Sequence, residues 1–568
     1  MADAGRGSAN SPESIRTLDP AWRKRTIWDL LETNASLRPD KEVLVTVDTR
    51  GVEHRVTYGQ LFDGAWSVAA ALARIGVRPG DHVAHWMTNT VDWVSFFFGA
   101  MRIGAVLIPI NTWLKADEIG YILRKAGAQH LVMQDRFRQV DFTDLLAEIV
   151  PEWVGARAGD LHSAGFPRLR NVVVLRRSPD RQRQPNAIDY EDLLAEPGEG
   201  RELADQLAQS VRPTDLGFVM FSSGSTGFPK GVMLEQWGLV TNGLLHSRRL
   251  GVTEHDRYFS SMPFFHAGGC IWGLMTVVSQ GATLVFTEAN DGRLAAELLE
   301  RERCTINFVG PSPIYYGMAA ALEDHPRRFD SIWLGIAADP DLYAAFRKIF
   351  GVTNFLSPYG MTELYGAAIL TGREDSAGRQ QGGWGKPLDG VELRLVDPET
   401  GLEVPPGSIG EICLRGLVMR GYYDLPDETS SAIDAKGWMH TLDLGVMDEQ
   451  GYVRYVGRIK AMLKVGGESV AAEEVEAVVR QFPGVAEAAV IGVPNRRMGE
   501  LPRAYVVQLP KAEVDVGELR AWCSHRLARF KVPADFIVVE ALPMTGSNKV
   551  DRAALVRMDR GAGADNVN

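Results

Sequence analysis

The segment that most constrains this chain is Ser222 to Gly231, which reads S-S-G-S-T-G-F-P-K-G directly after an apolar run. That run, Leu216 to Phe221, has the length and composition of a β-strand, so it predicts a strand that leads into a glycine-rich loop. Glycines let backbone N–H groups curl around an anion, and hydroxyls and Lys230 add donors and a positive charge. The pattern predicts a phosphate-binding loop. It differs from a P-loop, in which Gly and Lys are adjacent and Ser or Thr follows.

Length and composition limit the class of protein. The 568 residues exceed what one core usually supports, so we expect at least two domains. A hydrophobic content of 45% with 23% charged residues is typical of a globular protein. The net charge of −11 argues against nucleic acid as a partner. Four widely separated cysteines predict neither a disulfide framework nor a zinc site, and we expect a cytoplasmic protein.

Two segments raise the question of targeting. Residues 1–18 begin with a small, polar stretch, which predicts a disordered tail rather than a signal peptide. Trp93 to Ile110 is apolar but contains Arg102, glycines and a proline. That composition favours a buried helix followed by a strand over a transmembrane segment.

The order of strand-like and helix-like segments predicts an α/β fold. From residue 216 to 362 the two kinds alternate, which indicates mainly parallel sheets covered by helices. The expected strands there are 282–286, 305–309, 332–337 and 354–356, with helices at 294–303 and 342–350. After residue 386, short strands with Gly and Pro turns predict an antiparallel, β-barrel-like segment. The last hundred or so residues read helix, strand, strand, helix, strand, which predicts a small α+β domain.

Seven collinear segments resemble the motifs of adenylate-forming enzymes, a superfamily that includes acyl-CoA synthetases, carrier-protein-loading adenylation domains and beetle luciferases. The glycine-rich loop is the first. The other six are P-F-F-H-A-G-G from Pro263, Y-G-M-T-E from Tyr359, G-E-I-C-L-R-G from Gly410, G-W-M-H-T-L-D-L-G from Gly437, G-R-I-K-A-M-L-K-V-G-G-E-S-V from Gly457 and P-M-T-G-S-N-K-V-D-R from Pro543. The resemblance covers about Trp28 to Val556.

The resemblance implies a two-step reaction. A carboxylate attacks the α-phosphate of ATP with Mg²⁺, which gives an acyl-adenylate and pyrophosphate, and a nucleophile such as the thiol of coenzyme A then displaces AMP. Neither step needs a covalent protein intermediate, so catalysis would lie in positioning and in stabilising charge on oxygen atoms. The resemblance also implies an N-terminal adenylation domain, residues 19–457, and a mobile C-terminal domain, residues 458–568.

The resemblance assigns residues to the phosphates and the metal. The loop residues that would hold the β- and γ-phosphates are Ser222, Ser223, Gly224, Ser225, Thr226, Gly227 and Lys230. Thr362 would hydrogen-bond the α-phosphate. Glu363 and Thr226 would hold Mg²⁺, a hard cation that prefers oxygen ligands.

Further residues would bind the nucleoside and the reacting groups. Tyr359 would lie against the adenine. Asp443 would accept both ribose hydroxyls, and Arg458 would support the same sugar. Lys549 would bridge the substrate carboxylate and the α-phosphate, because two anions approach closely only with a cation between them.

The second step would use the C-terminal domain in another orientation. Lys460 occupies the hinge about which this domain would turn. Lys464, Gly466 and Gly467 belong to the loop that would enter the site for transfer to coenzyme A.

The acyl pocket would be lined by uncharged residues, which implies an acid with a neutral tail. The predicted lining residues are His266, Gly268, Gly269, Trp333, Gly335, Ile336, Ala337, Gly360, Met361 and Tyr365. His266 would also take part in catalysis. Tyr365 stands where a small residue is common and should shorten the pocket. A medium-chain, cyclic or aromatic acid is therefore favoured over a long fatty acid.

The chain departs from the family pattern at a few positions. Leu442 replaces a common Gly, and since a positive φ would cost leucine roughly 1–2 kcal/mol, we expect an extended backbone there. Asn548 replaces Gly but tolerates left-handed geometry. Ala461 replaces an acid beside the hinge. These changes weaken the inference of coenzyme A as acceptor more than that of adenylation.

Three other functions stay open. A stand-alone adenylating amide synthetase or acyl-AMP ligase would pass the acyl group to an amine or a carrier protein. A serine hydrolase would use Ser312 in G-P-S-P-I, which lacks the last glycine of a nucleophile elbow. A non-catalytic nucleotide-binding protein is the third. The sequence leaves open the acid and whether the chain forms a homodimer.

Overall fold

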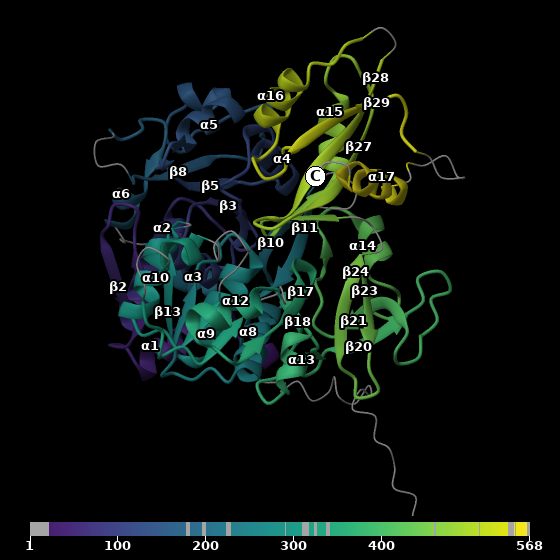
Figure 1. Ribbon diagram of the computed structural model, residues 1–568. Helices are drawn as coiled ribbons and strands as arrows, with labels where there is room; N and C mark the ends of the chain where they lie inside the picture. Colours follow the sequence, from purple (N-terminus) through teal and green to yellow (C-terminus); the bar gives the residue numbers. More distant parts are fainter. Residues whose placement is uncertain are drawn as a thin grey trace, which may run out of the picture.

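Two large sheets with helices between and around them form the body of the protein (Figure 1). The computed structural model describes residues 22–177, 182–195, 200–222, 229–289, 291–308, 317–322, 327–336, 341–458, 462–509, 512–543, 550 and 552–564. The chain begins there with a short 3₁₀ helix, η2 (Trp22–Lys24), and α1 (Ile27–Leu37).

The first sheet has eight strands in the order β22-β11-β10-β4-β3-β5-β8-β9. Its strands are β3 (His82–Trp86), β4 (Val106–Pro109), β5 (His130–Gln134), β8 (Asn171–Leu175), β9 (Ile188–Asp189), β10 (Leu216–Ser222), β11 (Lys230–Glu235) and β22 (Gly421–Tyr422). It is parallel except at β11, which is antiparallel to β10 and β22. Strands such as β8 (N-V-V-V-L) are buried along their whole length because both faces of the sheet are covered.

The second sheet has seven strands in the order β16-β15-β14-β12-β13-β1-β2. Its strands are β1 (Glu42–Val47), β2 (Glu53–Thr57), β12 (Arg257–Ser260), β13 (Thr283–Thr287), β14 (Ile306–Phe308), β15 (Leu334–Ile336) and β16 (Phe355–Leu356). All pairs are parallel except β1 with β2.

Helices fill three layers around these sheets. The layer between the sheets holds α1, α2 (Tyr58–Arg74), α3 (Val91–Arg102), α8 (Gln236–Leu250) and α9 (Thr276–Gln280). The outer layers hold α4 (Ala116–Ala126) and α5 (Phe142–Ile149) on the first sheet, and α10 (Gly292–Arg301) and α12 (Asp341–Phe350) on the second. Leu107 faces the central layer and Ile108 the outer one, as the two-residue period of a strand requires. The smaller elements are β6 (Arg136–Phe137), β7 (Val140–Asp141), η3 (Pro151–Gly155), α6 (Tyr190–Ala195) and α7 (Gly200–Ala208).

Antiparallel sheets follow the parallel ones along the chain. One has three strands, β17 (Pro358–Met361), β18 (Gly366–Leu370) and β19 (Lys386–Pro387). The other has four, β20 (Glu392–Val396), β21 (Ile409–Arg415), β23 (Met439–Met447) and β24 (Val453–Arg458). A bridge between Gly385 and Val453 joins the two. The short helices here are η5 (Thr362–Leu364), α13 (Ala377–Gln381) and α14 (Pro426–Ala432).

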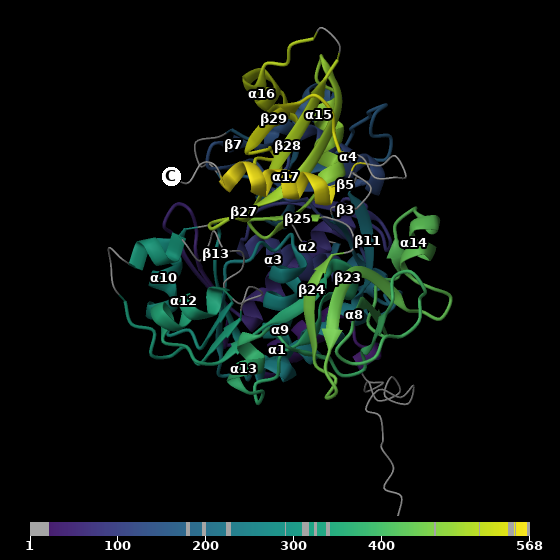
Figure 2. The same ribbon diagram turned by 45° about the vertical axis from the view of Figure 1, so that its right-hand side comes forward.

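The C-terminal part has a sheet and a core of its own, drawn in yellow-green and yellow against the larger body in Figure 2. Its strands are β25 (Met462–Val465), β26 (Glu468–Ala471), β27 (Val485–Asn495), β28 (Gly499–Gln508) and β29 (Asp535–Val539). Its helices are α15 (Ala472–Arg480), α16 (Val516–Arg526) and α17 (Arg552–Ala564). Helix α16 packs against α4 of the larger body.

The fold class predicted from the sequence is confirmed. The expected strand before the glycine-rich loop is β10, and the apolar stretch from Trp93 to Ile110 is α3 followed by β4. No helix in the described residues is long and apolar enough to cross a bilayer. The domain boundary near residue 457 and the hinge at Lys460 stay predictions.

Candidate functional site

The turn between β10 and β11 forms one end of the candidate site. Ser222 pairs with Lys230 across the two strands, and residues 223–228 lie outside the described segments. The buried carboxylate of Glu363, in η5, accepts hydrogen bonds from Ser222 Oγ at 3.3 Å and from Tyr422 Oη at 3.0 Å. Lys230 Nζ lies 5.1 Å from the centre of the Tyr422 ring. Glu363 therefore lies at the base of the predicted phosphate loop.

The surroundings of Glu363 fit a divalent cation. Within the described part of the chain its carboxylate pairs with two neutral hydroxyls and with no lysine, arginine or histidine. A buried carboxylate normally needs a cation partner. An oxygen ligand in this setting suits Mg²⁺.

The predicted ribose and adenine residues also meet in the structure. Tyr359, on β17, donates from its hydroxyl to Asp443 Oδ2 at 2.9 Å, and Asp443 is buried on β23. The Tyr359 ring stacks on Tyr455 of β24 at a centroid distance of 6.0 Å. A carboxylate beside a flat aromatic face is the arrangement that the resemblance implies for an adenosine.

The extended backbone expected at Leu442 is wrong. Leu442 has a φ of 59°, in the left-handed region that glycine favours, although it is leucine. Its N–H donates to Glu411 Oε1 at 2.9 Å, and Glu411 Oε2 lies 2.9 Å from His440 Nδ1. Thr441 Oγ1 donates to the carbonyl of Ile412 at 2.7 Å. These tertiary hydrogen bonds hold the turn that precedes Asp443.

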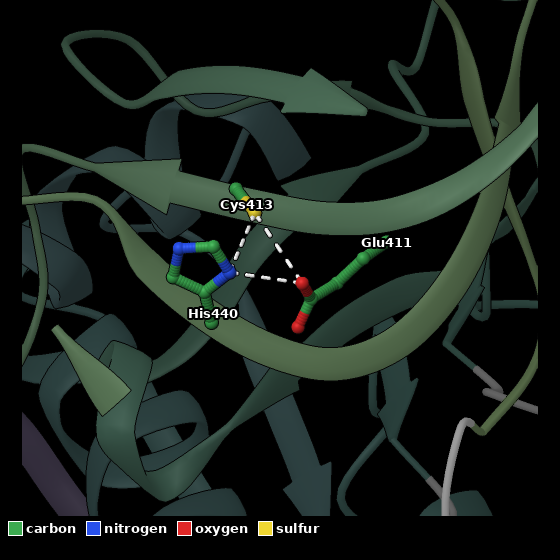
Figure 3. Close-up of side chains that lie close together, drawn as sticks. All are labelled: Glu411, Cys413 and His440. Carbon is green, nitrogen blue, oxygen red and sulfur yellow. Dashed lines mark hydrogen bonds and ion pairs between the residues drawn. The ribbon is translucent and has the colours of Figure 1, made fainter. Parts of the chain in front are cut away.

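Glu411, Cys413 and His440 bring three possible metal ligands within 4.8 Å of one another (Figure 3). Burial raises the pKa of the Cys413 thiol to about 12, so the thiol stays protonated at neutral pH. Glu411 uses both oxygens on Leu442 and His440. The group is better explained as support for the turn before Asp443 than as a metal centre. The sequence motifs predicted no role for these three residues.

The predicted acyl-site loop, residues 263–269, is held by backbone packing and by Asn89. A Cβ on Gly269, in the π-helical segment η4 (Gly268–Met275), would lie 2.1 Å from the carbonyl oxygen of Pro263, so only glycine fits there. Asn89 Nδ2 donates to the Met262 carbonyl at 2.9 Å, and its Oδ1 accepts from the N–H of Phe264 at 2.7 Å. These contacts fix the loop that carries His266.

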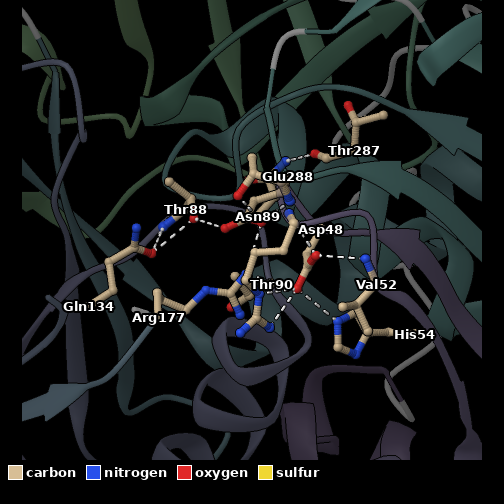
Figure 4. A network of polar contacts seen from close by, with 12 residues as sticks. Asp48, Val52, His54, Thr88, Asn89, Thr90, Gln134, Arg177, Thr287 and Glu288 are labelled. Carbon is tan, nitrogen blue, oxygen red and sulfur yellow. Dashed lines mark hydrogen bonds and ion pairs between the residues drawn. The ribbon is translucent and has the colours of Figure 1, made fainter. Parts of the chain in front are cut away.

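A network of polar side chains lies behind Asn89 (Figure 4). Arg177 Nη2 lies 2.9 Å from Glu288 and 3.6 Å from Asp48, and Thr88 Oγ1 donates to Glu288 at 2.9 Å. The network lines a cavity of about 180 Å³. Its charged groups pair with one another, so it anchors the ends of β1, β3 and β13 behind the site.

The C-terminal domain reaches the predicted acyl-site loop through its first hairpin. Gly466 and Gly467 connect β25 to β26 with φ values of 62° and 90°, as in a two-residue hairpin turn that requires positive φ at both positions. The next residue, Glu468, places Oε1 2.7 Å from His266 Nε2. The predicted second-step loop and the predicted acyl-site histidine thus lie together.

Four of the remaining predicted pocket residues pack closely against their neighbours. Gly360 has no room for a side chain, since a Cβ would lie 1.6 Å from the Gly366 carbonyl oxygen. Gly335 faces Phe355 in the outer layer, whereas Ile336 faces the central layer. Tyr365 is fully buried, and its hydroxyl accepts from the N–H of Glu235 at 3.1 Å.

Other predicted residues have less defined positions. Trp333 Nε1 donates to Asp256 at 3.1 Å. Gly268, Met361 and Thr362 are partly exposed, and Lys464 is exposed. The side chain of Arg458 is not described, and Ser223, Gly224, Ser225, Thr226, Gly227, Ala337, Lys460, Lys549 and Ser312 lie outside the described residues. The roles of all these residues stay predictions.

Comparison with protein families gives two matches. The model of the AMP-binding enzyme family matches residues 31–423, and that of the AMP-binding enzyme C-terminal domain matches residues 474–549.

Curated relatives resemble nearly the whole chain. The putative acyl-CoA synthetase YngI of Bacillus subtilis is 33% identical over 93% of this chain and 96% of its own. The 3-[(3aS,4S,7aS)-7a-methyl-1,5-dioxo-octahydro-1H-inden-4-yl]propanoyl:CoA ligase of Rhodococcus jostii is 36% identical over 88% of this chain and 93% of its own. The mitochondrial medium-chain acyl-CoA ligase ACSF2 of Mus musculus is 30% identical over 93% and 87%.

Solved structures share the fold. A double mutant of o-succinylbenzoate CoA synthetase (MenE) from Bacillus subtilis, bound with a product analogue, has a TM-score of 0.77 at 26% identity, over 94% of this chain and 98% of its own. The amide bond synthetase McbA from Marinactinospora thermotolerans has a TM-score of 0.75 at 23% identity, over 94% and 99%, which indicates the fold alone.

Proposed function

The chain belongs to the AMP-binding enzyme family, and we propose that it activates a medium-chain, cyclic or aromatic carboxylic acid with ATP and Mg²⁺ and transfers the acyl group to coenzyme A. The coarser activity, that of an AMP-forming acyl-CoA ligase that uses ATP and coenzyme A, follows from the family and from relatives that match most of the chain.

The observation that carries the choice of acceptor is the contact between Glu468 and His266. It brings the Gly466–Gly467 turn, predicted to act in the second step, to the acyl-site loop of the larger domain. A hairpin that reaches the acyl site supports a reaction in which the C-terminal domain helps the thiol reach the adenylate. The TM-score of 0.77 to a synthetase bound with a CoA product analogue supports a C-terminal domain orientation that suits the second step.

The range of acids is supported by the relatives and by the loop around His266. The relatives include a medium-chain ligase, a ligase for a bicyclic propanoyl acid and an o-succinylbenzoate synthetase. Gly268 and Met361 leave part of their surface accessible and carry no charge. A neutral acyl tail fits such a wall.

The residues of this chain supply binding and charge placement. Asp443 and Tyr359 would hold the nucleoside, and Lys230 would neutralise phosphate charge at the loop. Glu363 would hold Mg²⁺, which supplies positive charge to the phosphate oxygens when bound. The carboxylate attack and the departure of pyrophosphate then need orientation rather than a protein nucleophile.

A panel of carboxylic acids tests the proposal. Each acid is incubated with ATP and Mg²⁺, with and without coenzyme A, and pyrophosphate and products are measured by coupled assay and mass spectrometry. We expect AMP, pyrophosphate and an acyl-CoA from at least one medium-chain, cyclic or aromatic acid. Amide products with an amine panel, and no thioester with coenzyme A, would favour the alternative of an amide synthetase.

A matched pair of variants tests the role of the hairpin. Glu468→Gln removes the charge that faces His266, and we expect slower thioester formation with first-turnover pyrophosphate release retained. Glu476→Gln is the control, because Glu476 of α15 accepts from the N–H of Val490 and from the Arg552 side chain, both within the same domain. Equal effects of the two variants would contradict a role for the contact between the domains.

A further inference from the structure

Three buried polar atoms gather near the acyl-site loop without a hydrogen-bond partner. In the described residues, Asn242 Oδ1, His246 Nε2 and Trp272 Nε1 have essentially no accessible surface and no partner. Nearly all buried polar atoms in native proteins are paired, so a group of unpaired ones needs an explanation. A ligand with a polar group would supply the missing partner.

Three elements, α8, η4 and β18 (Gly366–Leu370), bring these atoms together. Asn242 and His246 lie one turn apart on the same face of α8. Asn242 Nδ2 donates to the Ala367 carbonyl of β18 at 2.7 Å, and the Trp272 ring of η4 stacks on the His246 ring at a centroid distance of 5.8 Å. A Cβ on Gly366 would lie 2.1 Å from Trp272 Nε1. Asn242 and Trp272 therefore border the start of β18, and His246 lies against the Trp272 ring.

The elements that carry the three polar atoms also carry, or pair with, residues of the predicted acyl site. Trp272 lies about one helical turn after Gly268 in the same segment, η4. β18 pairs with β17, which carries Gly360 and Met361. The Trp272 side chain remains partly exposed although its Nε1 is buried. The three polar atoms thus lie deeper in the molecule than His266, which is partly exposed. The far end of an acyl tail would lie at this depth.

The hydrogen-bonding roles of the three atoms can be assigned. Burial lowers the pKa of His246 to about 3, so the ring is neutral. His246 Nδ1 lies 2.9 Å from Thr276 Oγ1, a hydroxyl that has no other acceptor among the described residues. Nδ1 therefore accepts, and Nε2 carries the proton. Trp272 Nε1 is a donor, and Asn242 Oδ1 is an acceptor because its amide nitrogen donates to Ala367.

We propose that Trp272, His246 and Asn242 form a polar subsite for an oxygen substituent, a ketone or a hydroxyl, on the otherwise apolar tail of the acid. A carbonyl oxygen can accept from Trp272 Nε1 and His246 Nε2, and a hydroxyl can in addition donate to Asn242 Oδ1. The inference rests on the proposed function and names the tail chemistry that the site selects.

The chain offers matched controls in a similar pair elsewhere. His85 is also buried, burial lowers its pKa to about 3, and its ring stacks on Trp93 at 5.1 Å. His85 Nδ1 and Trp93 Nε1 are likewise unpaired. Trp93 is fully buried, whereas Trp272 keeps accessible surface, so the Trp272 pair lies nearer to a surface that a ligand can reach.

The test compares oxocyclohexylpropanoic acid, its hydroxycyclohexyl counterpart and cyclohexylpropanoic acid as substrates. From kcat/KM for pyrophosphate release, we expect wild type to prefer an oxygenated acid by about 10- to 100-fold, since the apolar acid leaves buried donors unpaired. His246→Phe and Trp272→Phe should reduce this ratio to below about threefold by slowing the oxygenated acid. His85→Phe and Trp93→Phe should keep the ratio.

The outcomes separate this inference from the proposed function. Equal kcat/KM for the three acids in wild type would overturn the subsite, and this comparison needs no folded variant. An unchanged ratio in both His246→Phe and Trp272→Phe would overturn it as well. A preference for the ketone acid but not for the hydroxyl acid would show that the donors Trp272 Nε1 and His246 Nε2 form the subsite without Asn242 Oδ1. If no acid of a broad panel supported pyrophosphate release, the proposed function would be refuted, and the subsite with it.

Discussion

A buried lysine between the two domains leads to the most detailed prediction. Lys531, just before β29, has a side chain that is 4% exposed, and its Nζ lies 2.6 Å from Glu118 of α4 and 2.7 Å from Glu474 of α15. Glu118 also accepts from the N–H of Ala528 at 3.1 Å. Since Glu118 belongs to the larger body and the others to the C-terminal part, these contacts exist in the described orientation and would be broken by a rotation of the small domain.

Glu118→Gln is the perturbation, because it keeps the shape of the side chain and removes its charge. Removing one partner of a buried charge pair costs about 2–5 kcal/mol. The low end applies here, because Glu474 still pairs with Lys531. Burial and then the neighbouring Glu118 raise the pKa of Glu474, so the variant also relieves some repulsion. A loss of about 2 kcal/mol lowers the population of this orientation about 30-fold.

The two half-reactions measure this loss. We expect thioester formation from supplied acyl-adenylate to fall by up to about 30-fold, with first-turnover pyrophosphate release largely retained. Glu302→Gln is the matched control, because Glu302 is a buried carboxylate paired with Arg55 and Arg257 inside the larger body. It should lower stability without changing the ratio of the half-reactions. If Glu118→Gln folds and leaves that ratio at the wild-type value, the contact does not set the domain orientation.

Three further predictions concern substitutions of individual residues. Leu442→Gly should raise the free energy of unfolding by up to about 1 kcal/mol, because glycine adopts a φ of 59° without strain, and a clear loss in chemical denaturation would contradict this. Burial would raise the pKa of Asp48, but hydrogen bonds, led by that from Arg50, lower it to about 2. The contribution of Asp48 to stability is therefore present above about pH 4 and is lost as the pH falls through 2. Asp48→Asn should flatten that part of the profile of stability against pH. Lys549→Ala should slow adenylation by about 10²–10³, whereas Gly467→Trp should block thioester formation in half-reaction assays, and equal losses in both would contradict alternating domains.

Local patterns in the sequence determined the class of fold and the nucleotide end of the site. The apolar run before Ser222, the glycines after it and the alternation of strand and helix patterns are properties of neighbouring residues, and β10, β13 and β14 appear where they predict. Asp443 and Tyr359 were named from motifs, and the structure brings them within hydrogen-bond distance.

The tertiary structure decided what depends on residues far apart in the chain. The strained turn at Leu442 is held by Glu411, 31 positions earlier, so the cost of a positive φ, taken alone, gave the wrong backbone. His266 meets Glu468 across 202 positions, and Lys531 meets Glu118 across 413. Short-range patterns report backbone preference and burial, whereas the partner of a buried charge or a donor is set by which elements pack together. The contacts between the domains and the unpaired polar atoms around Trp272 could therefore be seen only in the tertiary structure.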